Sequence, residues 1–182
     1  MNSLRYILKE DYRRIYPNKI GFLKIIKLIY TNDITYKKWK YIKYMRICDA
    51  LDYKSNLYDK IKKLYYQRKK NKLGLLFGYE IGSKNIGPGL CLYHNGPIVI
   101  NGNSIIGNNC SLHGDNCIGN DGIDDNCPII GNNVEIGVGA KIIGKVVIED
   151  DVIIGAGCVV VSDIKEKGSV VVGVPGSIIK KR

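Results

Sequence analysis

The chain contains only two histidines, His94 and His113, and they are the residues best suited to acid–base chemistry. An imidazole titrates near neutral pH, so it can take a proton from a hydroxyl group as that group attacks an electrophile. His113 directly follows Leu112, an aliphatic residue of a regular repeat, so its side chain is expected to project outward. His94 lies just before the repeat becomes regular. Both are expected on the outer surface of a repetitive scaffold, because the filled interior leaves only that surface for function.

The scaffold is predicted by an aliphatic residue at almost every sixth position between residues 100 and 160, and only position 124, an aspartate, breaks the series. Neither the helical period of 3.6 nor the strand period of 2 produces this spacing. Hexapeptide repeats do, and they build a parallel β-helix with three short faces in each coil. An acidic loop that leaves the coil is expected around residues 121–125. The inward series is Ile100, Ile106, Leu112, Ile118, Ile130, Ile136, Ile142, Ile148, Ile154 and Val160.

The N-terminal third has a different composition and predicts a small α-helical domain. Apolar residues at helical spacing predict helices over 22–29, 35–50 and 57–65, the last capped by Ser55. A first helix is expected to end at or before Tyr16, because Pro17 follows. The fold class is therefore mainly β, with a basic α-helical domain over 1–75 and a parallel β-helix over 76–182.

Charge divides along the same boundary. Residues 1–75 hold 20 Lys and Arg against 6 Asp and Glu, whereas residues 76–182 hold 8 against 11. Three interpretations of the basic helices stay open: a solvated face, a peripheral contact with an anionic membrane surface, and nucleic-acid binding. No nucleic-acid motif accompanies the charge, so we expect no nucleic-acid partner.

Two segments resemble the serine acetyltransferase-like branch of the hexapeptide acyltransferases. They are GLCLYHNGPIVINGNSIIGNNCSLHGDNCIG and the closing VIIGAGCVVVSDIKEKGSVVVGVPGSIIKKR. The segment with MRIC followed by YEIG is similar to the smaller members found among capsule and O-antigen acetyltransferases. The resemblance implies a left-handed β-helix, a homotrimer or higher homo-oligomer with sites between subunits, and acetyl-CoA as the donor.

The same resemblance implies a catalytic pair. The family's general base matches His94, and the upstream acid that orients the base matches Glu80. A carboxylate on the far ring nitrogen would fix the tautomer of the base and stabilise the imidazolium. We expect direct acetyl transfer to a hydroxyl group, with no acyl-enzyme.

The chain departs from the serine enzymes at two places that bear on the acceptor. Tyr93 replaces their aspartate before the base, and residues 126–128 read Asn-Cys-Pro in place of Arg-His-Pro. A neutral sugar hydroxyl in surface-polysaccharide synthesis is therefore the predicted acceptor, with Tyr93, Asn95 and His113 as substrate-binding residues. Serine O-acetylation is the alternative. A non-catalytic β-helix scaffold is the alternative of another class.

Coenzyme A lies along the C-terminal coils in this family, so small and basic residues there are predicted to bind it. Ala140 also fits a small inward position of the repeat, and both interpretations stay open. The candidates are Gly139, Ala140, Ala156, Gly157, Pro175 and Lys180.

No metal site is expected, because a zinc-dependent β-helix enzyme generally needs about three histidines at the metal. The six cysteines form no CxxC pair and no secretory signal is evident at the N-terminus. We therefore expect reduced thiols and a cytoplasmic protein.

Overall fold

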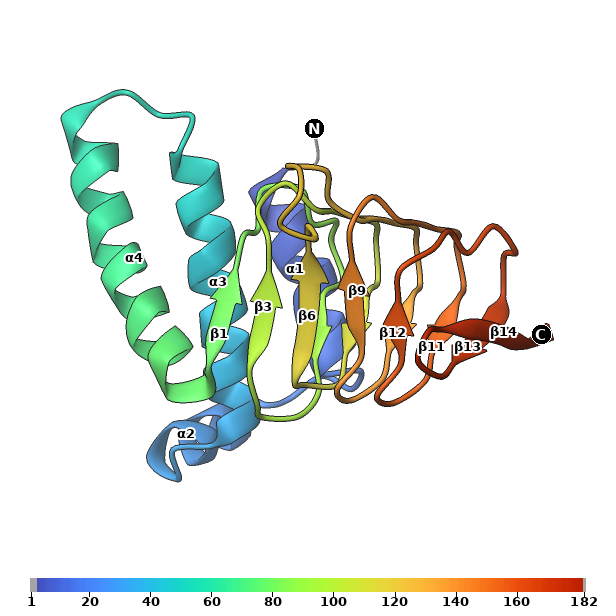
Figure 1. Cartoon of the computed structure of the whole chain (residues 1–182). Helices are drawn as coiled ribbons and strands as arrows, with labels where there is room; N and C mark the ends of the chain where they lie inside the picture. The colour runs from blue at the N-terminus through green and yellow to red at the C-terminus, as the bar shows by residue number, and fades with distance from the viewer. Residues whose placement is uncertain (1–2, 182) are drawn as a thin grey trace. The chain divides into compact units, whose positions relative to one another are not determined.

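A computed structural model describes residues 3–181 and divides into two compact units between Phe77 and Gly78. The first unit consists of helices and the second of short parallel strands, so the predicted mainly β architecture with an N-terminal helical part is confirmed (Figure 1). In the described residues no helix combines the length and the apolar character needed to cross a bilayer.

The helical unit contains the four expected helices in the described residues. Side-chain oxygens cap three of them: Ser3 accepts from the Tyr6 N–H, Asp33 from Tyr36, and Asn56 from Asp59. The predicted cap of the last helix, Ser55, is therefore wrong by one residue, because the Asn56 amide oxygen lies 2.8 Å from the Asp59 nitrogen. The helices are α1 (Leu4–Ile15), α2 (Phe22–Tyr30), α3 (Ile34–Leu51) and α4 (Leu57–Phe77).

The interior of this unit is built around α3, whose Tyr41, Ile42 and Met45 are fully buried. A buried ion pair joins α3 to α1: the Arg46 guanidinium donates to both carboxylate oxygens of Asp11, at 2.9 and 3.3 Å. A bidentate pair of this kind fixes both distance and orientation. It therefore sets the contact between these two helices more specifically than apolar packing would.

The apolar faces of α2 and α4 lie on the surface of the unit. Helical spacing predicted these faces as packing surfaces, yet no residue of α2 is buried, and Leu57, Ile61 and Leu64 of α4 are all more than half exposed. The four helices are present as predicted, but α4 continues to Phe77, twelve residues beyond the predicted segment 57–65. What the spacing does not specify is whether an apolar face packs within its own unit.

The second unit is a left-handed parallel β-helix made of three sheets. In Figure 1 the strands of the first sheet stand side by side along the axis. That sheet contains β1 (Tyr79–Ile81), β3 (Ile98–Ile100), β6 (Asn116–Gly119), β9 (Lys141–Ile143) and β12 (Val159–Val160). The second contains β4 (Ile105–Ile106), β7 (Ile129–Ile130) and β10 (Val147–Ile148). The third contains β2 (Cys91–Leu92), β5 (Ser111–Leu112), β8 (Glu135–Ile136), β11 (Ile153–Ile154), β13 (Ser169–Val172) and the antiparallel β14 (Ser177–Lys181).

Each sheet aligns one inward aliphatic residue per coil. Along the third sheet Leu92 pairs with Leu112, Leu112 with Ile136, and Ile136 with Ile154. All of these side chains are almost completely buried. The aliphatic residues at every sixth position of the sequence therefore form the core, as predicted. Parallel strands stack about 4.8 Å apart, so the aliphatic side chains of successive coils lie in contact along the interior.

The interrupted position of the series lies in a loop. Residues 120–128 connect β6 to β7 and are largely exposed, with Ile123 at 88% exposure. The predicted acidic loop is confirmed. The Asn126 amide and backbone N–H both donate to the Asp124 carboxylate, and these hydrogen bonds lower the pKa of Asp124.

The same substitution, Ile to Ala, should lower the free energy of unfolding in the β-helix core much more than in the loop. Ile130→Ala removes a side chain that is 2% exposed and should lower the free energy of unfolding by about 2–5 kcal/mol. Ile123→Ala, in the loop, should change it by less than about 0.5 kcal/mol. Urea unfolding followed by circular dichroism measures both. Equal losses in the two variants would contradict the inward assignment of the repeat.

Candidate active site

The two histidines lie at one corner of the β-helix, where the chain leaves the third sheet and enters the first sheet of the next coil. We call this the histidine corner, and it comprises residues 93–97, 113–115, 137–140 and 155–158. Backbone hydrogen bonds stack these turns: the Gly139 N–H donates to the Gly114 carbonyl at 3.0 Å, and the Gly157 N–H to the Val138 carbonyl at 2.8 Å. The corner is therefore a regular column of turns.

Tyr93, His113 and Glu135 form a connected group at this corner. The Tyr93 and His113 rings are stacked, with centroids 4.6 Å apart and planes at 13°. The His113 Nε2 atom lies 3.0 Å from the Glu135 Oε1 atom. A carboxylate at this position holds the imidazole ring in one orientation and favours the tautomer with hydrogen on Nε2. The group thus presents a fixed aromatic surface with a half-exposed tyrosine on its outer side.

His94 is beside this group and is exposed. Its ring centroid is 5.9 Å from that of His113, with the planes at 46°. Its backbone carbonyl accepts a hydrogen bond of 3.3 Å from the Tyr79 hydroxyl, and burial raises the pKa of that phenol, which keeps the donor protonated. Within residues 3–181 neither ring nitrogen of His94 has a hydrogen-bond partner, so a lone pair is available to take a proton.

Glu80 is not joined to His94 in this structure. Glu80 is exposed on β1, where it pairs with Val99 in the first sheet, and no hydrogen bond or ion pair links it to another residue in the described range 3–181. No contact between the predicted acid and the predicted base is therefore seen within residues 3–181, and the carboxylate that contacts an imidazole there is Glu135, which contacts His113. Sequence reasoning missed Glu135, although its place directly before inward Ile136 marks it as outward-facing.

Asn116 and Gly114 support the histidine corner from inside. The Asn116 amide is buried; it accepts from the Gly114 N–H at 2.9 Å and donates to the Gly137 carbonyl at 2.8 Å. Gly114 has φ +100°, and a Cβ atom there would lie 3.2 Å from the Asn95 carbonyl oxygen. The turn between His113 and the next strand therefore requires glycine, and the buried amide fixes it to the coil below.

Most of the predicted coenzyme A residues lie at the histidine corner or beside it. Ala156 and Gly157 are exposed at the turn after β11, and Pro175 and Lys180 are exposed near the end of the coil. Ala140 is a correction, since its side chain is fully buried in the core and cannot line a surface site. Asn95, the remaining predicted substrate residue, is exposed next to His94.

The described residues hold no cluster of three or more His, Cys, Asp or Glu side chains arranged to bind a metal. All six cysteines are free thiols, and burial raises the pKa of Cys48 and of Cys158, which makes both less reactive as nucleophiles.

Comparison with known proteins gives two kinds of relative in sequence. The chain is 36% identical over 108 residues to a serine acetyltransferase of Synechococcus elongatus, covering 58% of this chain and 44% of the relative. It is 39% identical over 72 residues to a protein of Escherichia coli named as a colanic acid biosynthesis acetyltransferase, WcaB, covering 38% of this chain and 44% of the relative. The chain thus spans less than half the length of these curated relatives.

Comparison of structures gives the fold. A serine acetyltransferase from Brucella abortus, solved in complex with coenzyme A, superposes with a TM-score of 0.67 at 21% identity, over 97% of this chain and 68% of that one. Residues 127–162 match the family of bacterial transferase hexapeptide repeats. The β-helix of this chain is therefore similar to the bacterial hexapeptide-repeat transferases, and residues 127–162 carry their repeat.

Proposed function

We propose that the protein is an acetyl-CoA-dependent O-acetyltransferase that acts at the histidine corner. The observation that carries the proposal is the pair of imidazoles whose centroids lie 5.9 Å apart on the outer surface, one unpaired and one held by a carboxylate. Relatives of both kinds carry the name acetyltransferase. A scaffold without catalysis would not require two imidazoles and a carboxylate close together on its outer surface.

His94 is the general base in this proposal. It removes the proton of the acceptor hydroxyl as the oxygen attacks the thioester carbonyl of acetyl-CoA, a step typically worth 10²–10⁴ in rate. The tetrahedral intermediate collapses, the C–S bond breaks, and the proton held by His94 passes to the leaving thiolate. The products are an acetyl ester and free CoA, with no covalent enzyme intermediate.

His113 acts as a positioning residue. Its Nε2 atom is engaged by Glu135, and its ring stacks on Tyr93, so it holds the aromatic surface next to His94 rather than exchanging protons itself. An acceptor that lies on this surface brings its hydroxyl to the unpaired imidazole. Orientation of this kind lowers the entropic part of the barrier.

Coenzyme A is proposed to lie along the turns of the later coils. Ala156 and Gly157 are small and exposed there, which leaves room for the pantetheine arm close to the backbone. Lys180 is exposed and can face the phosphates. The support for this placement is the regular stacking of the histidine corner, which leads from the imidazoles to these turns without a break.

Two acceptors have support. L-serine is favoured by the comparisons, because the sequence relatives and the structural neighbours include serine acetyltransferases. A sugar hydroxyl is favoured by the half-exposed Tyr93 ring, which is held flat by its stack on His113, and by the WcaB relative. A pyranose ring presents C–H groups to such a surface, whereas serine needs charged partners for its carboxylate and ammonium groups. Serine is at least as well supported as the sugar.

Trimerisation and a cytoplasmic location also belong to the proposal. The β-helix leaves aliphatic side chains exposed on its second sheet, such as Ile105 and Ile129, and a closed ring of subunits would cover surfaces of this kind. A site shared between subunits could supply groups that the single chain lacks at His94, including a carboxylate.

The first functional prediction compares the two imidazoles. His94→Gln should lower kcat at least about 10²-fold, because it removes the base. His113→Gln should mainly raise KM and lower kcat by less than about tenfold, because it loosens the surface that orients the acceptor. Steady-state kinetics with free-CoA detection measures both, and circular dichroism controls for folding. If His113→Gln lost more kcat than His94→Gln, the base would be His113, paired with Glu135.

Glu80→Gln, measured in the same assay, tests whether Glu80 orients His94 as the family resemblance implies. The Glu80 side chain has no hydrogen-bond or ion-pair partner in the described residues 3–181, so kcat should stay within about threefold of the unsubstituted enzyme if Glu80 acts only as a surface residue. A loss as large as that of His94→Gln would show that Glu80 reaches the base in the working assembly.

The second functional prediction concerns the acceptor. Acetyl-CoA should be consumed in the presence of L-serine or of one member of a panel of sugars and nucleotide sugars, well above its hydrolysis without acceptor. Tyr93→Ala should raise KM for a sugar at least about tenfold and change KM for serine little, because only the sugar ring uses the aromatic surface. Turnover with none of these acceptors would contradict an O-acetyltransferase that uses serine or a sugar.

A further inference from the structure

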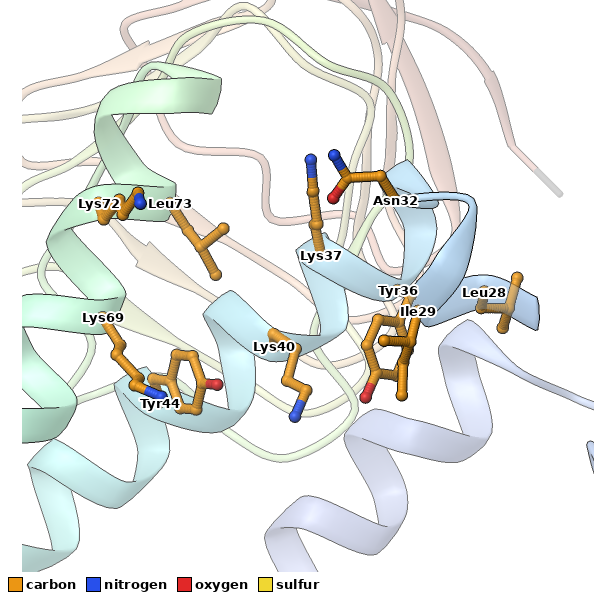
Figure 2. A pocket seen from close by; sticks show the side chains of 10 residues that line it. All are labelled: Leu28, Ile29, Asn32, Tyr36, Lys37, Lys40, Tyr44, Lys69, Lys72 and Leu73. Carbon is orange, nitrogen blue, oxygen red and sulfur yellow. The ribbon is translucent and has the colours of Figure 1, made fainter. Parts of the chain in front are cut away.

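The helical unit has a basic pocket that the proposed function does not use. Side chains of α2, α3 and α4, with Asn32 between the first two, line an open pocket of about 270 Å³ (Figure 2). Four lysines line it, Lys37 and Lys40 from α3 and Lys69 and Lys72 from α4, together with two tyrosines, aliphatic side chains and one asparagine. No acidic residue is among the lining side chains. The pocket is therefore apolar inside and positively charged at its edge.

The four ammonium groups are not neutralised by the protein. In the described residues 3–181 none of them forms an ion pair with a carboxylate, although other lysines of the same unit do, such as Lys63 with Asp52. Lys40 lies over the ring of Tyr36 at 5.3 Å from the centroid. Such contacts orient an ammonium group but leave its charge available to an anion.

Helix α2 continues the pocket with an exposed apolar face. Phe22, Leu23, Ile26, Ile29 and Tyr30 lie at positions i, i+1, i+4, i+7 and i+8, which is one side of a helix, and all are exposed, Phe22 by 75% and Leu23 by 81%. Ile29 also lines the pocket, so the two features form one surface. A helix with an apolar face in water and lysines beside it is typical of helices that lie in a membrane interface.

We propose that this pocket and the apolar face of α2 form a docking site for an anionic phospholipid surface. Lipid phosphates contact the lysines that line the pocket, and the α2 side chains enter the boundary between head groups and acyl chains. The proposal does not depend on the acetyltransferase assignment, because none of these residues belongs to the histidine corner.

Charge favours a lipid over a second copy of the chain. Two copies docked through this surface would bring eight lysines together with no acidic partner among the pocket residues, and like charges in contact are unfavourable. The unit as a whole carries 20 basic against 6 acidic residues, so a like-charged copy is repelled and an anionic surface is attracted. An anionic head group with an apolar body satisfies both parts of the site.

The test is sedimentation of the full-length protein with vesicles at 0.15 M salt. Vesicles of phosphatidylglycerol and phosphatidylcholine should bind it, and pure phosphatidylcholine should bind at least tenfold less. A pocket variant replaces Lys37, Lys40, Lys69 and Lys72 by Gln. A matched control replaces Lys9, Lys54, Lys60 and Lys62 by Gln; these lysines lie outside the pocket and outside α2, and their replacement gives the same change in net charge.

The pocket variant should lose at least about tenfold in binding to the anionic vesicles, since each lysine near such a surface contributes on the order of 1 kcal/mol. The control should lose less than about threefold, because its lysines are not part of the pocket and act only through the net charge of the unit, which salt screens. Equal losses would mean that net charge alone attracts the protein, and would overturn the pocket assignment. Binding to neither vesicle would overturn the proposal itself.

Further measurements test the apolar face of α2 and distinguish a lipid from free phosphate and from a second copy of the chain. The double variant Phe22→Ser and Leu23→Ser should weaken vesicle binding, whereas Leu57→Ser and Tyr58→Ser, equally exposed on α4, should not. If inorganic phosphate at 10 mM abolished vesicle binding at constant ionic strength, a free phosphate would be the ligand rather than a lipid. If the pocket variant changed the oligomeric state in light scattering, the occupant would be a second copy.

Discussion

The candidate site depends on the parallel hydrogen-bond ladder between successive coils. The Tyr93 N–H donates to the Leu112 carbonyl at 2.9 Å, and the His113 N–H donates to the Ile136 carbonyl at 3.0 Å. Tyr93 follows the inward Leu92, and His113 follows the inward Leu112. These bonds therefore place Tyr93 beside His113 on neighbouring coils. Tyr93 and His113 stack for this reason, and Glu135 comes within reach of His113 as a neighbour of Ile136. The chemistry of the surface therefore follows from the packing of the interior.

Much of the β-helix could be predicted from the sequence, because one residue type at one position of a short repeat determines the inward direction. The outward contacts between coils could not. Leu92 and Leu112 are 20 residues apart, whereas Leu112 and Ile136 are 24 apart, because residues 120–128 lie outside the coil. Without the exact ends of that loop, the carboxylate opposite His113 cannot be identified. The family resemblance gave the acid as Glu80, which the structure leaves unpaired in the described residues 3–181.

The helical unit shows a different limit of sequence reasoning. Periodic apolar residues located its helices well, since amphipathic spacing is a local property. Burial is not local, and the faces of α2 and α4 turn out to be exposed. Asp11 and Arg46 show the opposite behaviour, since they are charged and yet buried. Charged residues are rarely buried unless they pair, and helical spacing does not indicate such a pair. Removing one partner alone would leave an uncompensated buried charge, so the two helices that carry the pair are fixed together.

The loop over residues 120–128 shows how insertions are accommodated in this architecture. Strands β6 and β7 on its two sides keep their pairing with the coils above and below, because every ladder bond is made along the axis and none across the corner. A corner can therefore gain or lose residues while the core stays in register. In such a fold the length of one corner loop can diverge between related proteins independently of the histidine corner. New recognition surfaces can then arise by insertion while the imidazoles keep their positions.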